Sequence, residues 1–279
     1  MTLEPGEAWT RRALEDLREA RYRPASWARF LRASLARALD VRAARPQLAR
    51  QATGWSAAAL LAAGAARELA DVSGTPAPRR GPAVAWWAAT GLMLDWHLGM
   101  VEGPGGEVRP LSLADALTLV RLALVPFAAA AAPSAPLFLT LLAAAATTDL
   151  ADGPLARRAG PTRLGRDLDY AADIAFVMAA TTAATRARWL PGPAAALIAA
   201  RSAAPVVTLA VGYFRDARRP PTKPFGDARW TSPLLYGGLA AAALSRRRVG
   251  PALAVAGSLG ALGSYATGAP ERRKEVSTT

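Results

Sequence analysis

Residues 135–157 read APLFLTLLAAAATTDLADGPLAR, an apolar run of leucine and alanine that ends in two aspartates and a glycine. A run of about 20 mostly apolar residues has the length at which an α-helix crosses the hydrocarbon core of a bilayer, about 30 Å. The stretch therefore predicts a membrane-spanning helix over 135–155 that carries carboxylates at its end.

Similar apolar blocks recur along the rest of the chain. Of its 279 residues 52% are hydrophobic, and the mean hydropathy is +0.15. Most of this content is alanine and leucine gathered in blocks, whereas a soluble domain spreads it along amphipathic stripes. The predicted fold is all-α, a polytopic transmembrane bundle with a six-helix core in 111–270 and a polar tail over 271–279. The six helices are expected at 112–132, 135–155, 165–187, 191–214, 231–245 and 249–267.

The chain is strongly basic, with 34 Lys and Arg against 21 Asp and Glu, a net charge of +13 and a pI near 11.3. Basic patches can bind nucleic acid, but arginine-rich loops also mark the cytoplasmic side of membrane proteins. The apolar blocks favour the second interpretation, so no nucleic-acid partner is expected. Two basic loops, 157–166 and 215–229, fall on one side under alternating topology, and that side is predicted to be cytoplasmic. No Cys is present, which excludes disulfide and thiol chemistry.

The first 54 residues are rich in arginine and predict an amphipathic helical region. Its apolar stripe consists of Trp27, Phe30, Leu31, Leu35 and Leu39. Such a helix can lie in the cytoplasmic membrane interface or pack as a soluble helix on the rest of the protein, and the sequence leaves both open. Two weaker apolar stretches, 55–66 and 82–94, predict an extra helical hairpin within 55–110. Whether this hairpin crosses the membrane is also left open.

Aspartates stand at helical spacing on both sides of the first basic loop. Asp149 and Asp152 are three residues apart, and Asp169 and Asp173 are four apart, so each pair shares a helix face. Four carboxylates on two partly embedded helices repel one another and are costly in a low dielectric. A cation must therefore compensate them, and hard oxygen ligands suit Mg²⁺ or Mn²⁺.

Small and basic residues accompany these aspartates. Gly153 and Gly165 allow a ligand to approach the backbone closely. Arg157 is positioned for charge-assisted hydrogen bonds to a phosphate group. Together with the aspartates they predict a site for a phosphate-containing substrate.

The pattern D-x2-D-G-x2-A-R, seven residues, and then G-x3-D-x3-D runs from Asp149 to Asp173. It resembles the signature of the CDP-alcohol phosphotransferase family, and the resemblance extends over about residues 111–270. It implies a six-helix membrane fold with two divalent ions, Mg²⁺ or Mn²⁺, near the cytoplasmic surface. The implied metal ligands are Asp149, Asp152, Asp169 and Asp173, with Asp173 also the catalytic base for the acceptor hydroxyl. The residues implied to bind the CDP part of the donor are Gly153, Ala156, Arg157 and Gly165.

Residues 113–121, LADALTLVR, are similar to the first-helix pattern of that family, N-x-L-T-x-x-R, with Asp115 in place of the usual Asn. Asp115, Thr118 and Arg121 recur every three residues and form one polar face. This face should point at a cavity or partner, because exposure to lipid is costly. Thr118 is assigned to the CDP group and Arg121 to the acceptor; a local Asp115–Arg121 ion pair is the alternative.

Arg201 stands alone in the apolar run 194–211. An arginine within a membrane helix is a functional candidate, and here it can receive a phosphate on the acceptor. The alternative is an arginine that extends from a helix end toward water.

The predicted reaction is attack of an alcohol oxygen on the donor phosphorus that carries diacylglycerol, with release of CMP. The expected donor is CDP-diacylglycerol, and the expected acceptor is a polar alcohol of the glycerol 3-phosphate or inositol phosphate type. Pro126 and the connection 160–165 look most like phosphatidylglycerophosphate synthases, whereas Ile174 stands where that branch usually has Lys. The alternatives are a serine acceptor, a CDP-headgroup transferase that acts on diacylglycerol, and a non-catalytic membrane scaffold. The enzyme is expected in the cytoplasmic membrane, facing the cytoplasm, and the resemblance allows a homodimer.

Overall fold

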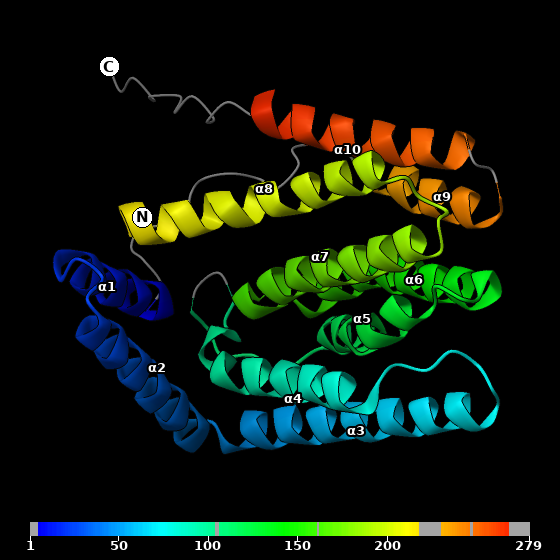
Figure 1. The fold of residues 1–279 in the computed structure, drawn as a ribbon. Coiled ribbons are helices and arrows are strands. Elements are labelled where there is room, and N and C mark those ends of the chain that lie inside the picture. Colours follow the sequence, from blue (N-terminus) through cyan, green and yellow to red (C-terminus); the bar gives the residue numbers. More distant parts are fainter. Residues whose placement is uncertain (1–4, 104–105, 161, 218–229, 246–247, 268–279) are drawn as a thin grey trace. The chain divides into compact units, whose positions relative to one another are not determined.

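The chain folds into helices, as the computed structural model in Figure 1 shows. The structure describes residues 5–103, 106–160, 162–217, 230–245 and 248–267. In these ranges the only β-pairing is an isolated bridge between Glu102 and Val108, so the all-α prediction is confirmed. The chain divides into two compact units, residues 1–189 and 190–279. The predicted tail 271–279 and most of the second basic loop lie outside the described residues.

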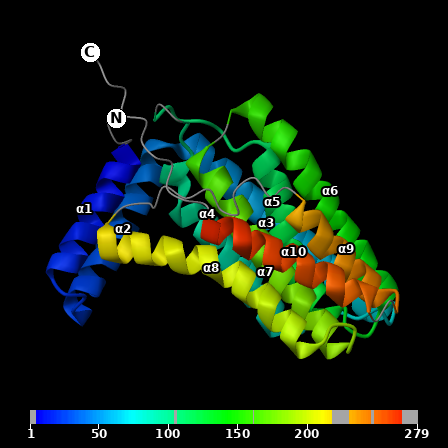
Figure 2. The ribbon, with the colours of Figure 1, turned by 90° about the horizontal axis from the view of Figure 1, so that it is seen from above.

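Among the described residues of the first unit there are seven α-helices and one 3₁₀ turn. They are α1 (Pro5–Glu19), α2 (Pro24–Ala44), α3 (Pro46–Val72), α4 (Arg80–Trp96), η1 (Leu98–Met100), α5 (Leu113–Ala130), α6 (Ala135–Ala159) and α7 (Arg163–Arg186). Helices α3 and α4 form a hairpin beside α5, while α1 and α2 lie at one end of the unit (Figures 1 and 2). The region expected as a hairpin thus begins nine residues earlier than the apolar stretch at Trp55, because α3 starts at Pro46.

The second unit contains α8 (Gly192–Asp216), α9 (Thr231–Ala243) and α10 (Val249–Thr267). Together with α5, α6 and α7 these are the six helices that the apolar blocks predict. Helices α5, α6 and α8 are long and apolar enough to cross a membrane, and α10 contains a shorter apolar stretch over 249–264. Helix α6 continues to Ala159, four residues past the predicted end. It ends at Gly160, whose φ of +84° is one that glycine adopts without strain.

A proline in α5 explains how α4 is attached to it. Pro126 has no N–H, so the carbonyl of Leu122, four residues earlier, loses its helical donor. The indole Nε1 of Trp86 donates to that carbonyl at 2.8 Å, and the Nε1 of Trp87 donates to the Ala123 carbonyl at 3.1 Å. The Trp86 indole therefore takes the carbonyl that the proline leaves without a helical donor, and the Trp87 indole adds a second hydrogen bond between the hairpin and the first core helix.

One apolar cluster extends from the hairpin into the core helices. Its buried members are Leu48, Ala49, Ala52, Leu94, Leu98, Val101, Leu111, Leu119, Leu122, Leu164 and Ala172. They come from α3, α4, the segment 98–111, α5 and α7. Burying apolar surface is the main favourable contribution to folding, so the N-terminal hairpin is part of the packed interior of the first unit.

Candidate functional site

The four aspartates of α6 and α7 meet around Arg121 of α5. Nη2 of Arg121 lies 2.6 Å from Asp152 Oδ2 and 3.7 Å from Asp149 Oδ1. Nη1 lies 2.7 Å from Asp169 Oδ1 and 2.6 Å from Asp173 Oδ1. The Arg121 side chain is fully buried, with 0% of its surface exposed, while its Nε donates to Thr148 Oγ1 at 3.3 Å. Three helices thus bring one guanidinium and four carboxylates to a single point.

The donor set of this group fits a divalent cation. One carboxylate oxygen from each of Asp149, Asp152 and Asp169 lies within 4.8 Å of the others. Asp173 joins the same group through its hydrogen bond to Arg121. Carboxylate oxygens are the ligands that Mg²⁺ and Mn²⁺ prefer. Four carboxyl groups face a single guanidinium here, so the group can accept a further cation.

The polar face of α5 points inward, as its spacing predicts. Asp115, Thr118 and Arg121 are exposed by only 3%, 3% and 0% of their surfaces. The described partners of Asp115 belong to a capping box, in which its Oδ2 accepts from the Ser112 N–H at 2.7 Å and from the Ser112 hydroxyl at 2.8 Å. Thr118 donates to the Ala114 carbonyl at 3.1 Å. Asp115 therefore holds the start of α5, and the ion pairs of Arg121 go to the aspartates.

The start of α7 packs tightly against the start of α5. The hydroxyl of Thr162 accepts from the Gly165 N–H at 3.0 Å and caps α7. A Cβ on Gly165 would lie only 2.9 Å from Asp115 Oδ1 and 3.0 Å from Thr162 Oγ1. The absence of a side chain at Gly165 thus brings the two helices close at the level of the aspartates.

The remaining residues predicted to bind the donor lie on the last turns of α6. Arg157 is exposed, and its Nη1 lies 3.4 Å from the position of a Cβ on Gly153, one turn earlier. Ala156 is half-buried beside them. A phosphate contact from this basic turn would therefore lie within two helical turns of Asp152.

Residues outside the aspartate motif support the connection between α6 and α7. The carboxylate of Glu102 is 2.8 Å from Arg45 Nη2, and its carbonyl accepts from the Arg163 N–H at 3.1 Å. Nη1 of Arg109 donates to the Ala159 carbonyl at 2.9 Å. These residues carry no helical or motif spacing that predicts the contacts, since each contact joins segments far apart in the chain.

Arg201 lies in the second unit, on α8, and is 5% exposed. Its Nη2 donates to the Ser232 hydroxyl of α9 at 3.2 Å. The arginine is therefore buried between two helices of its own unit, as expected for an intramembrane arginine that does not face lipid.

Comparison with known proteins places the site within one family. A family profile described as CDP-alcohol phosphatidyltransferase matches residues 111–261, which is more than half of the chain. The match contains α5 to α9 and most of α10, and with them all four aspartates and Arg121. No curated protein and no solved structure matches the chain.

Proposed function

The chain belongs to the CDP-alcohol phosphatidyltransferase family, and on that premise we propose that it transfers a phosphatidyl group from CDP-diacylglycerol to a polar alcohol, with release of CMP. The observation that carries the proposal is the convergence of four carboxylates on one point between α5, α6 and α7. Three helices with the length and apolarity of membrane spans suit a lipid donor that enters from the bilayer.

The metal ligands in this proposal are Asp149, Asp152, Asp169 and Asp173. When bound there, Mg²⁺ or Mn²⁺ would neutralise the diphosphate of the donor and stabilise the oxygen that leaves with CMP. Asp173 accepts the proton of the acceptor hydroxyl as the alcohol oxygen forms its bond to phosphorus. The bond between that phosphorus and the CMP oxygen breaks, and CMP leaves with the bonding electron pair.

The donor is held by residues on two sides of the aspartates. Gly153, Ala156 and Arg157 on α6, Gly165 on α7 and Thr118 on α5 are proposed to contact the CDP group. Arg157 supports this assignment because it is exposed one turn from Gly153 and supplies a planar set of donors that matches phosphate.

The acceptor in this proposal is an alcohol that itself carries phosphate, of the glycerol 3-phosphate or inositol phosphate type. Arg201 is the residue proposed to bind that phosphate, because a buried guanidinium in an apolar helix favours an anionic partner and its hydrogen bond to the neutral Ser232 hydroxyl supplies no negative charge. The likeness to phosphatidylglycerophosphate synthases belongs to this proposal, as does a cytoplasmic active site.

The first prediction tests the metal ligands. Asp152→Asn should lower the rate of CMP release from CDP-diacylglycerol by about 10²–10³-fold or more, since removing one group that stabilises transition-state charge typically costs that much. The assay measures CMP with a panel of phosphorylated and unphosphorylated alcohols at saturating Mg²⁺. Asp167→Asn is the matched control, because Asp167 lies on α7 beside Arg166 and outside the described metal-binding group.

Full activity of Asp152→Asn at saturating Mg²⁺, with normal insertion into the membrane, would remove the metal assignment. If the wild-type chain releases no CMP with any acceptor, the chain is a non-catalytic scaffold and the proposed activity is wrong.

A further inference from the structure

The guanidinium of Arg121 occupies the position where the aspartate oxygens converge. Three of its contacts, to Asp152, Asp169 and Asp173, are 2.6–2.7 Å long, which is the short end for charge-assisted hydrogen bonds. The contact to Asp149 is 3.7 Å. Three of these four carboxylates, those of Asp149, Asp152 and Asp169, are also members of the group whose oxygens lie close enough to hold a metal ion.

A divalent ion and this guanidinium cannot share the same oxygens without cost. An ion bound about 2.1 Å from a carboxylate oxygen would stand within about 5 Å of the arginine nitrogen that the oxygen already accepts from. Like charges at that separation repel, and the buried position of Arg121 leaves little water to screen them. This repulsion applies at three carboxylates, because Arg121 donates to Asp152, Asp169 and Asp173 together.

We propose that Arg121 is a built-in counter-cation that competes with divalent ions for the aspartate oxygens and thereby sets the metal affinity of the site. The proposal rests on the proposed metal ligands. Arg121 stabilises the four carboxylates, and metal binding must displace part of its hydrogen bonding. The guanidinium suits this role better than an ammonium, because its planar fork addresses several carboxylates together.

The test measures Mn²⁺ binding to the purified full-length chain by electron paramagnetic resonance, without any substrate. Arg121→Gln should bind Mn²⁺ more tightly than the wild type, because the ion no longer has to displace charge-assisted hydrogen bonds from the guanidinium. The expected decrease in the Kd for Mn²⁺ is about 10- to 150-fold. Arg121→Lys should fall between the two. In EDTA, Arg121→Gln should unfold at a lower temperature than the wild type, and saturating Mn²⁺ should raise its Tm by more.

Arg67→Gln is the matched control. Arg67 is also a buried arginine, pairs with Glu68 and Asp71, and donates to the Pro78 carbonyl, all away from the aspartates. Its loss should lower the Tm while the Mn²⁺ affinity stays that of the wild type. A change in Mn²⁺ affinity in this variant would mean that any buried arginine affects the site through stability alone.

Other outcomes separate this inference from the proposed function. Unchanged or weaker Mn²⁺ binding in both Arg121 variants would overturn the competition. Should Arg121→Gln fail to fold without metal, Arg121→Lys carries the same comparison. If instead wild type and Asp152→Asn bind Mn²⁺ equally, the metal site itself is wrong, and the role of Arg121 falls with it.

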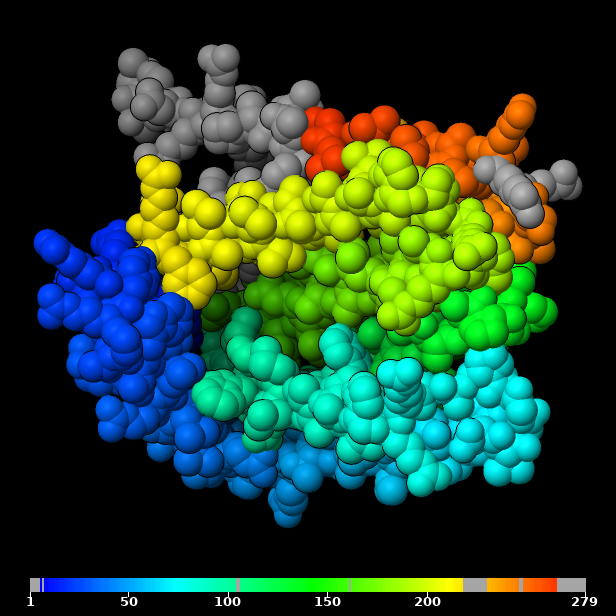
Figure 3. Space-filling model, viewed as in Figure 1, coloured from blue at the N-terminus to red at the C-terminus, as the bar shows by residue number. Residues whose placement is uncertain are grey.

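Helix α2 carries an exposed apolar stripe. The side chains of Leu31, Leu35 and Leu39 follow one face of this helix and are exposed by 52%, 45% and 57%. The sequence leaves open whether this stripe packs on the protein or lies in a membrane interface. The exposure of these leucines shows that the stripe is not packed within the first unit. Helix α2, in blue, lies at the surface of that unit (Figure 3).

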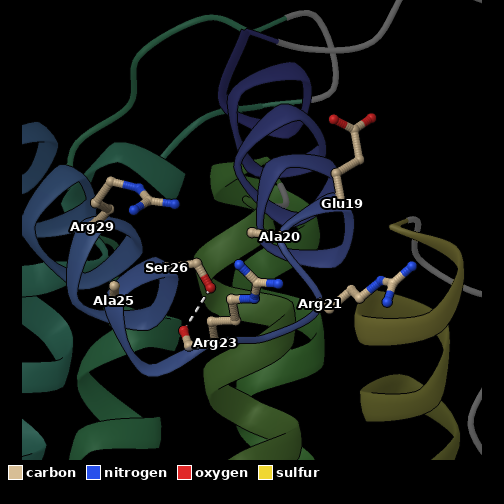
Figure 4. Close-up of a pocket in the computed structure, with 7 residues that line it drawn as sticks. All are labelled: Glu19, Ala20, Arg21, Arg23, Ala25, Ser26 and Arg29. Atoms are coloured by element: carbon tan, nitrogen blue, oxygen red, sulfur yellow. Dashed lines mark hydrogen bonds between the residues drawn. The ribbon is translucent and has the colours of Figure 1, made fainter.

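Basic side chains surround the start of the same helix. A cavity of about 310 Å³ at the turn between α1 and α2 is lined by Arg21, Arg23 and Arg29, with Glu19 as the one acidic residue (Figure 4). The Ser26 hydroxyl donates to the Arg23 carbonyl at 2.7 Å and shapes the turn. The end of α2 reaches the connection between α6 and α7 through Arg45 and Glu102, so the helix lies at the level where a predicted span ends.

We infer that α2 rests on the surface of an anionic bilayer, with the leucine stripe in the acyl boundary and the arginines at the lipid headgroups. Exposed leucines beside arginines are the features of helices that bind in this way. Arginines next to a membrane span are also attracted to the negative charge of anionic lipid headgroups. The occupant is therefore the same membrane that the spans cross.

Single cysteines test this placement, since the chain has no native Cys. A spin label at Leu35→Cys in proteoliposomes with anionic lipid should be accessible to oxygen and protected from a water-soluble nickel complex. A label at Ala33→Cys, exposed on the other side of α2, should show the reverse. Equal accessibility at both positions would overturn the inference. So would protection of Leu35→Cys from both reagents, which would point to a protein partner, or an identical result in neutral lipid.

Discussion

At the scale of single residues, a buried arginine in each unit has a different kind of partner. Arg121 is surrounded by carboxylates from α6 and α7. Arg201 on α8 contacts the hydroxyl of Ser232. A hydrogen bond that involves a charged group stabilises the folded protein or a complex by about 1.5–3 kcal/mol. The partner of each guanidinium therefore determines which group it can bind. The first is tied to the aspartates, and the second is the proposed receptor for the acceptor phosphate.

Arg201→Ala should raise the KM for a phosphorylated acceptor by about 10- to 150-fold and leave the KM for CDP-diacylglycerol nearly unchanged. The reason is that the arginine would contact only the anionic group of the acceptor. Ser232→Ala is the control, because it removes a neutral partner of Arg201 and keeps the charge. Steady-state kinetics with both substrates varied gives the two constants. A parallel rise in both would make Arg201 a structural residue.

At the scale of helices, two glycines determine how closely α9 and α10 approach each other. A Cβ on Gly238 would collide with the backbone of Ala254, and one on Gly250 would collide with the backbone of Ala242. Small residues let helix backbones come together in a membrane, where association depends on packing rather than on a hydrophobic drive. The short helix α9 is therefore held to its neighbour by close backbone contact.

Gly238→Ala should destabilise the protein by about 1–3 kcal/mol, the usual cost of forcing extra volume into a packed contact. Gly237→Ala is a control on the same helix, because no other atom lies within 4 Å of the added Cβ. That change should be neutral or stabilising by up to about 1 kcal/mol, since alanine favours helix over glycine. Thermal unfolding in detergent compares the two variants. Similar Tm values for both would contradict the close contact.

At the scale of the whole molecule, the N-terminal hundred residues pack as part of the first unit. The family match nevertheless begins only at residue 111. Leu48 and Leu94 share a buried cluster with Leu119 and Leu164. Arg109 and Glu102 hold the two ends of the connection between α6 and α7. The extension thus supports the segment that carries the aspartates.

The orientation of this segment can be measured. Single cysteines at Ala159, the last residue of α6, and at Arg188, just after α7, replace exposed residues on either side of α7. If α7 crosses the membrane with its basic start inside, Ala159→Cys should react with an impermeant maleimide from the cytoplasmic side and Arg188→Cys from the other. Labelling of both positions from one side would mean that α7 does not span the bilayer.

The sequence by itself determined the helices from 111 to 267 and the pairing of aspartates on two helix faces, because apolar blocks and residue spacing are local properties of a helix. It also determined the family through the motif between Asp149 and Asp173. Only the tertiary structure decided that Arg121 meets all four aspartates, that Asp115 caps α5, and that the N-terminal segment braces Ala159. Each of these depends on which distant segments pack together, and side-chain partners across such contacts have no periodic signal in the chain.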